Sequence, residues 1–588
     1  MGVLLTTLNA KYIHSSLALR CLQAYCRPVC SQQIMLKEYT INNHLLDVVS
    51  DIFRQQPDVL GLACYIWNRE AIIDLAAMIR KVLPQTVIIL GGPEVSYDSV
   101  DCMAKHDFID YIIQGEGEET LRLLLEALAK GKEVTGIPGL VYRENQQPVK
   151  NSGPQVMESL NNIPFPYEEE KLDELKDKIL YYESSRGCPF SCQYCLSSAS
   201  EGVRFTHLAK VYRELAVFVK HNVKQVKFVD RTFNCRKEHY LPILRFLAKQ
   251  DCRTNFHFEI AADLLDDEVV GFFQDVPAGR FQLEIGVQST NEGTLAEIHR
   301  QNNWPKIVDN VTRILSYGNI HVHLDLIVGL PFETLPQFGK SFNDVYQLKP
   351  DMLQIGFLKL LKGCGIRRKA AEHGYVYMDK APYEVLGNRY MPYKEIRQLK
   401  IMEDVFNQYY NSGRFYYVLP FLIRLEQEDA FRFYRSLADF WEQRDLQLAA
   451  HNTKSLYHHL WDFCQIKYFL QKTACEEFLR FNALLLIEKT LLGAEFLNWN
   501  GDKWSDEKNR FWRNDAVVKK YLPHYLFTTW RNNKKNYHIE VFSGAMGAYL
   551  PEKELKGLSL PILFSWDGIQ ARYQVIAPED FWLSGRSC

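Results

Sequence analysis

The sequence predicts an α/β protein with three main parts: an N-terminal doubly wound, Rossmann-like domain, a partial or full parallel βα barrel, and a mainly helical C-terminal region with a small mixed end. Two observations carry this prediction. In the first two parts, short and continuously apolar runs alternate with helical patterns, as parallel strands buried on both faces require. After Tyr393 the pattern changes to long, aromatic-rich helical stretches. We place the domains at residues 1–140, 179–392 and 393–588, with a linker at residues 141–178.

The positions of the apolar runs give the expected elements. In the first domain the expected helices cover residues 15–25, 70–83 and 119–129, and the expected strands cover residues 3–8, 58–66, 86–90 and 110–113. In the barrel the strand candidates are residues 225–230, 255–260, 281–287, 321–328 and 352–357. The linker is predicted from its prolines, which stand at positions 138, 148, 154, 164 and 166.

Composition excludes several classes of protein. Of the 588 residues, 47% are hydrophobic and 24% are charged, and the net charge of -2 provides no global attraction for a polyanion. No stretch reaches the roughly 18 consecutive apolar residues of a membrane span, so we predict no membrane association. The N-terminus lacks the basic segment and apolar run of a signal peptide. The 14 cysteines are too sparse for a disulfide scaffold, so we predict a reduced, cytoplasmic protein whose clustered cysteines bind metal.

Three clustered cysteines, Cys188, Cys192 and Cys195, follow a strand-like run. Thiolates at this spacing on a short loop can each bind one iron of a cubane cluster and leave the fourth iron open. The open iron can then bind an exogenous ligand, such as the amino and carboxylate groups of a methionine. Soft thiolates also suit zinc, but a closed zinc site would need a fourth ligand at zinc-ribbon spacing, and none is nearby.

This spacing, with Gly187 before the first cysteine and Tyr194 before the third, resembles that of the radical S-adenosylmethionine superfamily. The resemblance implies a 4Fe–4S cluster that reductively cleaves S-adenosylmethionine to a 5′-deoxyadenosyl radical, with Tyr194 near the adenine. It also implies an external electron donor of the flavodoxin or ferredoxin type.

Further cofactor contacts follow from the same resemblance. Asp230 and Arg231 match the position where the methionine amino group is held, and Glu259 matches a ribose contact. Gln288 lies at a later strand end of the kind that shapes the adenine pocket. Each position also has a structural interpretation, as an ion-pair partner or a packing site. Their predicted place at the carboxyl ends of barrel strands favours the functional interpretation.

Glycines and polar residues follow the strands of the first domain, where ligands of open α/β sheets bind. Taken together, these positions resemble the cobalamin-binding domain fused ahead of many radical enzymes, over about residues 1–140. The positions that the resemblance assigns to cobalamin are Asn9, His14, Trp67, Gly91, Gly92, Glu94, Gly115 and Glu116.

Two of these residues keep alternatives. The loop around His14 departs from the Asp-x-His-x-x-Gly pattern, so the resemblance implies a cobalt without a histidine ligand. His14 then contacts the lower face or the nucleotide tail, or simply begins a helix. Trp67 either packs on the corrin or fills the core.

The sequence is therefore similar to cobalamin-binding-domain-containing radical S-adenosylmethionine enzymes, of the class B methyltransferase type. The implied reaction is methyl transfer from methylcobalamin to an unactivated carbon, after hydrogen abstraction by the deoxyadenosyl radical. Alternatives are a cyclisation or other radical rearrangement, a tRNA-base modification, and a non-enzymatic cobalamin carrier. The substrate stays open among a tRNA base, a peptide, and a small natural-product or lipid precursor.

The C-terminal third resembles an uncharacterised extension behind some cobalamin-type radical enzymes. Its arginines alternate with aromatics at Arg414–Tyr417 and Phe431–Arg435, which is a pattern that can hold single-stranded RNA. Acidic residues such as Glu426 and Glu442 are mixed in, and this favours an ordinary amphipathic helix bundle. Cys364, between two glycines, is a candidate active-site thiol.

Overall fold

The N-terminal sheet has seven strands in the order β2-β1-β3-β4-β5-β6-β7. The first five pair in parallel, whereas β6 and β7 are antiparallel additions. The strands are β1 (Val3–Asn9), β2 (Ile34–Thr40), β3 (Val59–Ala63), β4 (Val87–Gly91), β5 (Tyr111–Ile113), β6 (Leu140–Glu144) and β7 (Gln147–Lys150). The helices are α1 (Leu17–Cys26), α2 (Leu45–Gln55), α3 (Arg69–Val82), α4 (Pro93–Ser96), α5 (Ser99–Lys105) and α6 (Glu118–Lys130).

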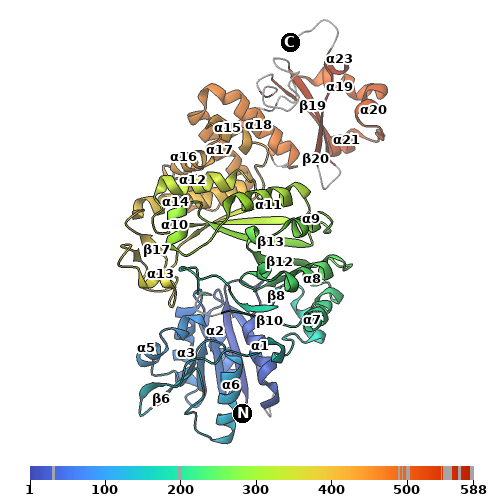
Figure 1. Cartoon of the computed structure of the whole chain (residues 1–588). Helices are drawn as coiled ribbons and strands as arrows, with labels where there is room; N and C mark the ends of the chain where they lie inside the picture. Colours follow the sequence, from blue (N-terminus) through green and yellow to red (C-terminus); the bar gives the residue numbers. More distant parts are fainter. Residues whose placement is uncertain are drawn as a thin grey trace. The chain divides into compact units, whose positions relative to one another are not determined.

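Helices cover both faces of this sheet (Figure 1, blue to teal). Leu4 of β1 packs in a core with α2 and α3, and its neighbour Leu5 packs in a second core with α1 and α6. This is the doubly wound arrangement that the continuously apolar strands predict. The sequence prediction omitted β2, an edge strand in which only Ile34 is buried. It also assigned the β6–β7 hairpin to the linker.

The second sheet has six parallel strands in the order β15-β14-β13-β12-β11-β8, so β8 and β15 are its edges and the barrel is partial. Its strands are β8 (Ile179–Tyr182), β11 (Gln225–Phe228), β12 (Asn255–Ile260), β13 (Phe281–Gln288), β14 (His321–Val328) and β15 (Met352–Phe357). Its helices are α7 (Leu208–Lys220), α8 (Lys237–Ala248), α9 (Asp267–Phe273), α10 (Glu292–Glu297), α11 (Trp304–Tyr317), α12 (Leu335–Tyr346) and α13 (Gly365–Arg368). Two short pairs, β9 (Ser185–Gly187) with β10 (Val203–Phe205) and β16 (Val376–Tyr377) with β17 (Val385–Gly387), accompany it.

Alternation along β13 separates the two faces of this sheet. Phe281, Leu283 and Ile285 are buried, while Gln282 and Glu284 between them are partly exposed. Because side chains alternate along a strand, the polar set shares one face. That face carries most of the candidate site.

The chain divides into two compact units, Met1–Ile396 and Arg397–Cys588. The computed structural model describes residues 1–29, 34–196, 202–487, 491–492, 494–497, 499, 503–543, 546, 559–566 and 571–582.

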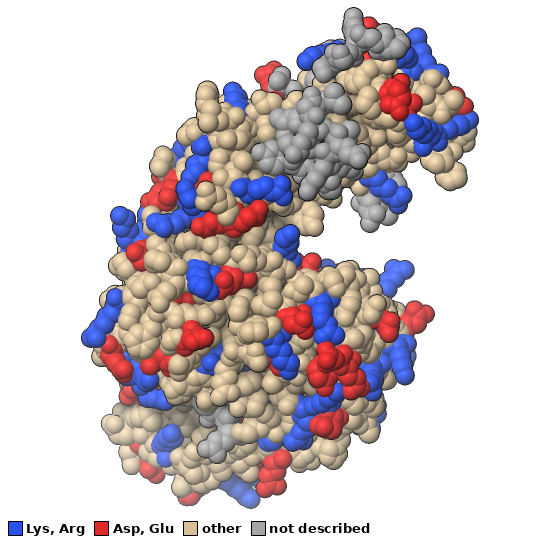
Figure 2. Space-filling view, turned by 45° about the horizontal axis from the view of Figure 1, so that its top comes forward, with Lys and Arg blue, Asp and Glu red and all other residues tan. Residues whose placement is uncertain are grey.

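The second unit is mainly helical and ends in the antiparallel sheet β18-β19-β20, as the sequence predicts. Helix α14 (Tyr393–Phe406) spans the boundary between the two units. The elements after it are α15 (Leu419–Leu425), α16 (Ala430–Glu442), α17 (Thr453–Lys467), α18 (Lys472–Leu485), α19 (Ser505–Arg513), α20 (Asp515–Tyr521), α21 (Trp530–Asn536), β18 (Tyr537–Phe542), β19 (Leu560–Trp566), β20 (Ala571–Val575) and α23 (Pro578–Phe581). Phe433 and Tyr434 of the arginine-aromatic pattern are fully buried and serve packing. On the face seen in Figure 2, side chains of both charge signs are intermixed. Within the described ranges we find no helix with the length and apolar character that a membrane crossing needs.

Gly187, the last residue of β9, must be glycine because β9 pairs closely with β10, and the cysteines lie on the connection that leaves β9. Its φ is +107°, and a Cβ there would lie 2.2 Å from the carbonyl oxygen of Gly202. We expect Gly187→Ala to lower the free energy of unfolding by about 1–3 kcal/mol or more. Gly271 in α9 is the matched control, because a Cβ there meets nothing within 4 Å. Gly271→Ala should be neutral or stabilise by about 0.4–1 kcal/mol. Denaturant midpoints that move equally for the two variants would contradict this account.

Candidate active site

The three predicted cysteines lie on the loop that follows β9. None of the three is in a disulfide, Cys188 and Cys195 are partly exposed, and Cys192 is buried. The loop folds back on itself where the Cys195 N–H donates to the Cys192 carbonyl at 3.1 Å. Three cysteines outside any disulfide on one loop fit a 4Fe–4S cluster, in which each thiolate binds a different iron.

Gln193 anchors this loop to two other segments. Its N–H donates to the Ile298 carbonyl at 2.9 Å, and its own carbonyl accepts from the Ile366 N–H at 2.8 Å. Its side-chain amide lies 3.0 Å from Nδ1 of His299. A Cβ at Gly365 would lie 1.8 Å from the Gln193 Oε1, so the Gln193 side chain can pack here only because residue 365 is glycine. The cluster loop is therefore held from both sides.

Arg300 is a site residue that the sequence did not reveal. Its guanidinium lies 3.2 Å from the Tyr194 hydroxyl and 3.9 Å from the Cys192 Sγ, and it also donates to the Gly286 carbonyl. Burial raises the pKa of Tyr194, so its phenol stays protonated. No motif marks Arg300, because its proximity to the cysteines arises only from folding.

Asp230 is fully buried at the carboxyl end of β11. Its carboxylate accepts from the Ser184 N–H at 3.0 Å, the Ser184 hydroxyl at 2.7 Å and the Ser185 hydroxyl at 2.6 Å. Burial raises its pKa to about 6 against the effect of these bonds. Asp230 thus fixes the turn between β8 and the cluster loop. Its neighbour Arg231 is exposed.

Charged side chains gather on the polar face of the second sheet. The Lys227 ammonium lies 3.0 Å from the Glu284 carboxylate and 3.6 Å from that of Glu259. Glu284 also lies 2.8 Å from Nε2 of His257. Burial raises the pKa of Glu284, but hydrogen bonds from His257 and Lys227 overcome it and hold the pKa at about 2. Burial, with help from Glu284 and Glu259, raises the pKa of Asp325 to about 8.

Gln288 ends β13 with a φ of +69°. A Cβ at Gly286 would lie 2.1 Å from its Nε2, so Gly286 leaves the space that the Gln288 amide fills. Any larger residue at position 286 would displace the Gln288 side chain.

The loop between β1 and α1 joins the two sheets of the first unit. Asn9 donates to the His14 carbonyl at 3.1 Å and to Glu38 at 3.2 Å. Nδ1 of His14 lies 2.7 Å from the hydroxyl of Tyr181 on β8, and partial burial followed by nearby lysines lowers the pKa of His14. The Ile179 N–H donates to the Ile13 carbonyl at 2.7 Å. The carboxyl end of β1 therefore adjoins the edge of the second sheet.

Trp67 lies beside this loop and is 45% exposed. Its indole N–H donates to the Leu8 carbonyl at 3.1 Å, and its ring stacks on Tyr65 with centroids 4.6 Å apart. Gly91 ends β4, and the next residue, Gly92, has a φ of +106°. A Cβ at Gly92 would lie 2.5 Å from the Cys64 carbonyl oxygen, so this turn requires glycine on backbone grounds.

Glu94, Gly115 and Glu116 contact other parts of the chain. The buried Glu94 carboxylate accepts from the Tyr383 hydroxyl at 2.8 Å. Glu116 pairs with Arg186 at 3.3 Å and with Arg204. A Cβ at Gly115, whose φ is +66°, would lie 2.7 Å from Pro154. These contacts join the first domain to the barrel and to the segment between them, and cofactor roles for these residues stay predictions.

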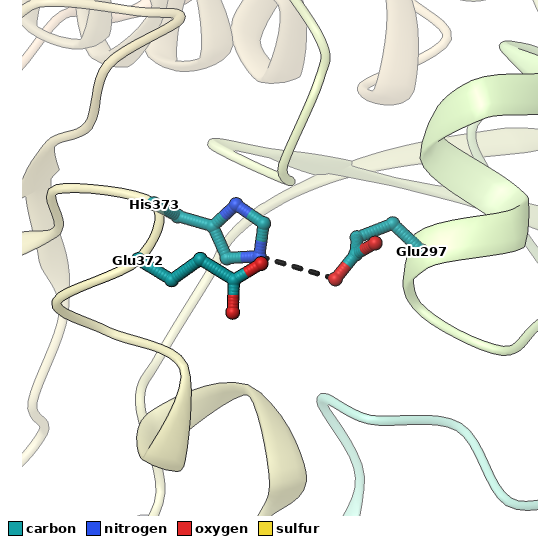
Figure 3. A group of neighbouring side chains, drawn as sticks. All are labelled: Glu297, Glu372 and His373. Atoms are coloured by element: carbon teal, nitrogen blue, oxygen red, sulfur yellow. Dashed lines mark hydrogen bonds and ion pairs between the residues drawn. The ribbon is translucent and has the colours of Figure 1, made fainter.

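A group of possible metal ligands lies apart from the cysteines. Ligand atoms of Glu297, Glu372 and His373 lie within 4.8 Å of one another, and the His373 ring faces Glu297 in Figure 3. However, the Lys369 ammonium lies 2.6 Å from the Glu297 carboxylate, and Nδ1 of His373 lies 3.2 Å from the Tyr390 hydroxyl. We interpret the group as an ion-pair network that fixes the end of α10.

Cys364 is buried, and its thiol donates to the Leu361 carbonyl at 2.9 Å. Burial raises its pKa, which disfavours the thiolate that a reactive cysteine needs.

Comparison with known families identifies both domains of the first unit. Residues 3–125 match the B12 binding domain, residues 182–345 match the radical SAM superfamily, and residues 371–564 match a protein family of unknown function, DUF4080. The chain therefore combines the two domains, B12-binding and radical S-adenosylmethionine, that define the class of cobalamin-dependent radical S-adenosylmethionine enzymes. The cofactors of this class are a 4Fe–4S cluster, S-adenosylmethionine and cobalamin, and its chemistry requires an external reductant.

Within this class the chain is similar to the cobalamin-dependent radical SAM methyltransferase TokK of Streptomyces tokunonensis, with 25% identity over 68% of this chain and 64% of TokK. It is 26% identical to the uncharacterized methyltransferase PH0819 of Pyrococcus horikoshii, over 52% of this chain and 68% of that protein. The chain thus spans about two thirds of these relatives. Its fold is shared with the cobalamin-dependent S-adenosylmethionine radical enzyme OxsB, with a TM-score of 0.59, 14% identity and coverage of 79% of each chain.

Proposed function

We propose that this protein transfers a methyl group from methylcobalamin to an unactivated carbon of its substrate. The observation that carries the proposal is the junction between its two cofactor domains. The β1–α1 loop of the B12-binding domain adjoins β8, whose exit leads to the cysteine loop. This junction brings the ligand-binding edge of one sheet to the strand that leads into the cluster loop.

Each part of the chain has a role in this proposal. Cys188, Cys192 and Cys195 bind the cluster, and Tyr194, Arg231, Glu259 and Gln288 contact S-adenosylmethionine. Asn9, His14, Trp67, Gly91, Gly92, Glu94, Gly115 and Glu116 surround cobalamin. The cluster supplies reductive cleavage of S-adenosylmethionine, and cobalamin supplies the methyl carrier.

The protein's own residues prepare this chemistry. Asp230 holds the β8 exit through Ser184 and Ser185, which fixes where the cluster loop begins. Burial raises the pKa of Asp325 to about 8, so the carboxyl group is mostly protonated at neutral pH and can donate a hydrogen bond to a ligand on the polar face. Lys227 and His257 keep Glu284 ionised, so the same face can also accept hydrogen bonds from a ligand.

The test uses the anaerobically reconstituted protein with S-adenosylmethionine, methylcobalamin and a reductant of the flavodoxin or ferredoxin type. We expect 5′-deoxyadenosine and S-adenosylhomocysteine to form together when the substrate is present. Nucleosides from total tRNA of the host, with and without the gene, are the first substrate comparison. Loss of a methylated nucleoside would identify the substrate, and an unchanged profile would direct the search to peptides and small metabolites. Formation of 5′-deoxyadenosine with a rearranged and unmethylated product would contradict methyl transfer.

Trp67→Ala should weaken binding of cobalamin by about tenfold, because an aromatic contact contributes roughly 1 kcal/mol beyond the area it buries. Absorption titration of the whole chain with hydroxocobalamin measures the change. Trp530→Ala is the matched control, since Trp530 is 44% exposed against 45% for Trp67 and lies in the second unit. Equal affinities of the two variants would remove Trp67 from the site.

A further inference from the structure

Helix α20, the loop after it and helix α21 carry charge of one sign. Residues 516–539 contain no aspartate or glutamate, and their basic residues are Lys519, Lys520, Arg531, Lys534 and Lys535. In the whole chain, by contrast, 69 basic residues are balanced by 71 acidic ones. Basic residues that gather on one stretch of a protein in this way indicate a binding surface for a polyanion.

We infer that part of this stretch, the α21 surface, binds a single-stranded nucleic acid. The α21 surface consists of exposed side chains of the loop and of α21, namely Leu526, Phe527, Trp530, Arg531, Lys534 and Lys535. The inference goes beyond the proposed function, which leaves the substrate open. A nucleic-acid substrate for the proposed methyl transfer would follow from it, and only that step rests on the proposed function.

The aromatic side chains of the α21 surface are left outside the core. Phe527 and Trp530 are both exposed, and their rings meet edge to face with centroids 5.2 Å apart. Leu526, next to Phe527 in the chain, is 82% exposed. Large apolar side chains that gather on a surface mark a site of interaction. Nucleic-acid bases stack on exposed aromatic rings of this kind whatever the sequence of the strand.

Two cations of the α21 surface are available to phosphate groups. Among the residues that the structure describes, no carboxylate pairs with Arg531 or Lys534. The two lysines of α20, in contrast, each lie 2.6 Å from an aspartate carboxylate. Because Arg531 adjoins Trp530 in the chain, one strand can place a base on the ring and a phosphate on the guanidinium.

The loop that carries the aromatic rings is fixed by contacts with the core. Tyr525 is buried in a cluster with Ile539 of β18, and its hydroxyl donates to the Asn533 side chain at 3.0 Å. Thr529 caps the start of α21, where its hydroxyl accepts from the Asn532 N–H at 3.2 Å. A surface that is already ordered loses less conformational entropy on binding. The rings and the cations are therefore presented in a fixed arrangement.

The composition of α21 argues against a membrane surface as the partner. A helix that lies on a membrane needs a broad apolar face. Of the seven residues of α21, only Trp530 is apolar, and the others are arginine, lysine and asparagine. The exposed Asn536 adds an amide group, which suits the edge of an unpaired base.

The experiment measures binding of labelled strands to the whole, anaerobically purified chain, with no S-adenosylmethionine added. The probes are an RNA of about 15 nucleotides without self-complementarity and a DNA of the same sequence. Fluorescence anisotropy gives their affinities at about 50 mM and about 200 mM salt. We expect the wild type to bind, and its affinity to fall steeply between these salt concentrations. The strand that binds more tightly identifies RNA or DNA as the natural ligand.

Phe527→Ala should weaken binding about tenfold, because stacking of one base on an aromatic ring contributes that much or more. Arg531→Ala combined with Lys534→Ala should lower the slope of log affinity against log salt by about 1.4, because two phosphate contacts are lost. Phe469→Ala and Lys454→Ala are the matched controls, since both side chains are exposed in the second unit outside the α21 surface. The controls should bind the strands like the wild type. All the replaced side chains are exposed, so every variant should unfold at the temperature of the wild type.

Three outcomes would overturn the inference. The first is a wild type that binds neither strand, or variants of the α21 surface that bind as tightly as the controls. The second is displacement of the strands by poly-glutamate at equal charge concentration, which would reduce the surface to a general attraction for anions. The third is sedimentation with phosphatidylglycerol vesicles that depends on Phe527 while the strands stay unbound, which would assign the surface to a membrane.

These measurements are separate from the test of methyl transfer. A protein that binds the strands and methylates nothing would contradict the proposed function alone. A protein that methylates a peptide or a small metabolite and binds no strand would contradict the present inference alone.

Discussion

Replacing Cys188 by alanine is expected to reduce reductive cleavage of S-adenosylmethionine by about a hundredfold or more, because the proposed site holds the cluster by three thiolates and Cys188 supplies one of them. The iron content of the reconstituted protein should fall well below about four atoms per chain, and the broad absorption of the cluster should disappear. Production of 5′-deoxyadenosine from the protein, S-adenosylmethionine and dithionite measures the activity.

Cys252→Ser provides the control for this experiment. Cys252 is partly exposed, is in no disulfide and lies beyond the end of α8. Its backbone carbonyl accepts a hydrogen bond from Arg280. It should retain both iron and activity. If Cys188→Ala and Cys252→Ser produced the same amount of 5′-deoxyadenosine, the cluster would have to be placed elsewhere.

Asp230→Ala is expected to lower the free energy of unfolding by about 3 kcal/mol or more. The substitution removes the acceptor of three buried donors of Ser184 and Ser185, and each unsatisfied group costs about 1–3 kcal/mol. Of the three, the Ser184 hydroxyl keeps a second partner, Nε2 of His239 at 3.1 Å. Asp230→Asn keeps one acceptor oxygen at the same place and should be much less harmful. Denaturant unfolding of the anaerobic protein measures both variants.

Comparison of the wild type with Asp230→Asn tests the pKa of Asp230. Its pKa in the folded protein, about 6, lies above the ordinary value of 3.8. Because the folded state then binds the proton more tightly, Asp230 contributes stability below about pH 4, and this stability is lost as the pH rises through about 6. The unfolding free energy of the wild type, measured relative to Asp230→Asn, should therefore fall between about pH 4 and about pH 7. A constant or rising difference would show that the carboxyl group is ionised throughout.

The sequence predicts strands best where one or both faces are buried in a core. Strands β3, β12 and β14 lie inside sheets covered by helices, so their apolar runs are continuous or regularly alternating. The edge strand β2 has a single buried residue, Ile34, and therefore gives no such signal. The β6–β7 hairpin is short and contains Pro148, a residue that suggests a linker.

Some residues of the candidate site can be predicted from the sequence, whereas others are brought together only by folding. The three cysteines are evident from spacing because one loop supplies all of them. Arg300 is 108 residues from Cys192, and Tyr383 is 289 residues from Glu94, so only folding brings each pair together. The sequence predicts a cofactor contact at Asp230. The structure adds its hydrogen bonds from Ser184, which no sequence pattern specifies.

The join between the loop after β1 and strand β8 also limits how this enzyme can be rearranged. Ile179 bonds to Ile13, and Tyr181 bonds to His14, so a segment of the B12-binding domain pairs with the β8 edge of the second sheet. A chimera made by exchanging the B12-binding domain at the connecting segment would break these bonds. A B12-binding domain transplanted from another protein would therefore need a loop after its first strand that forms the same bonds to β8.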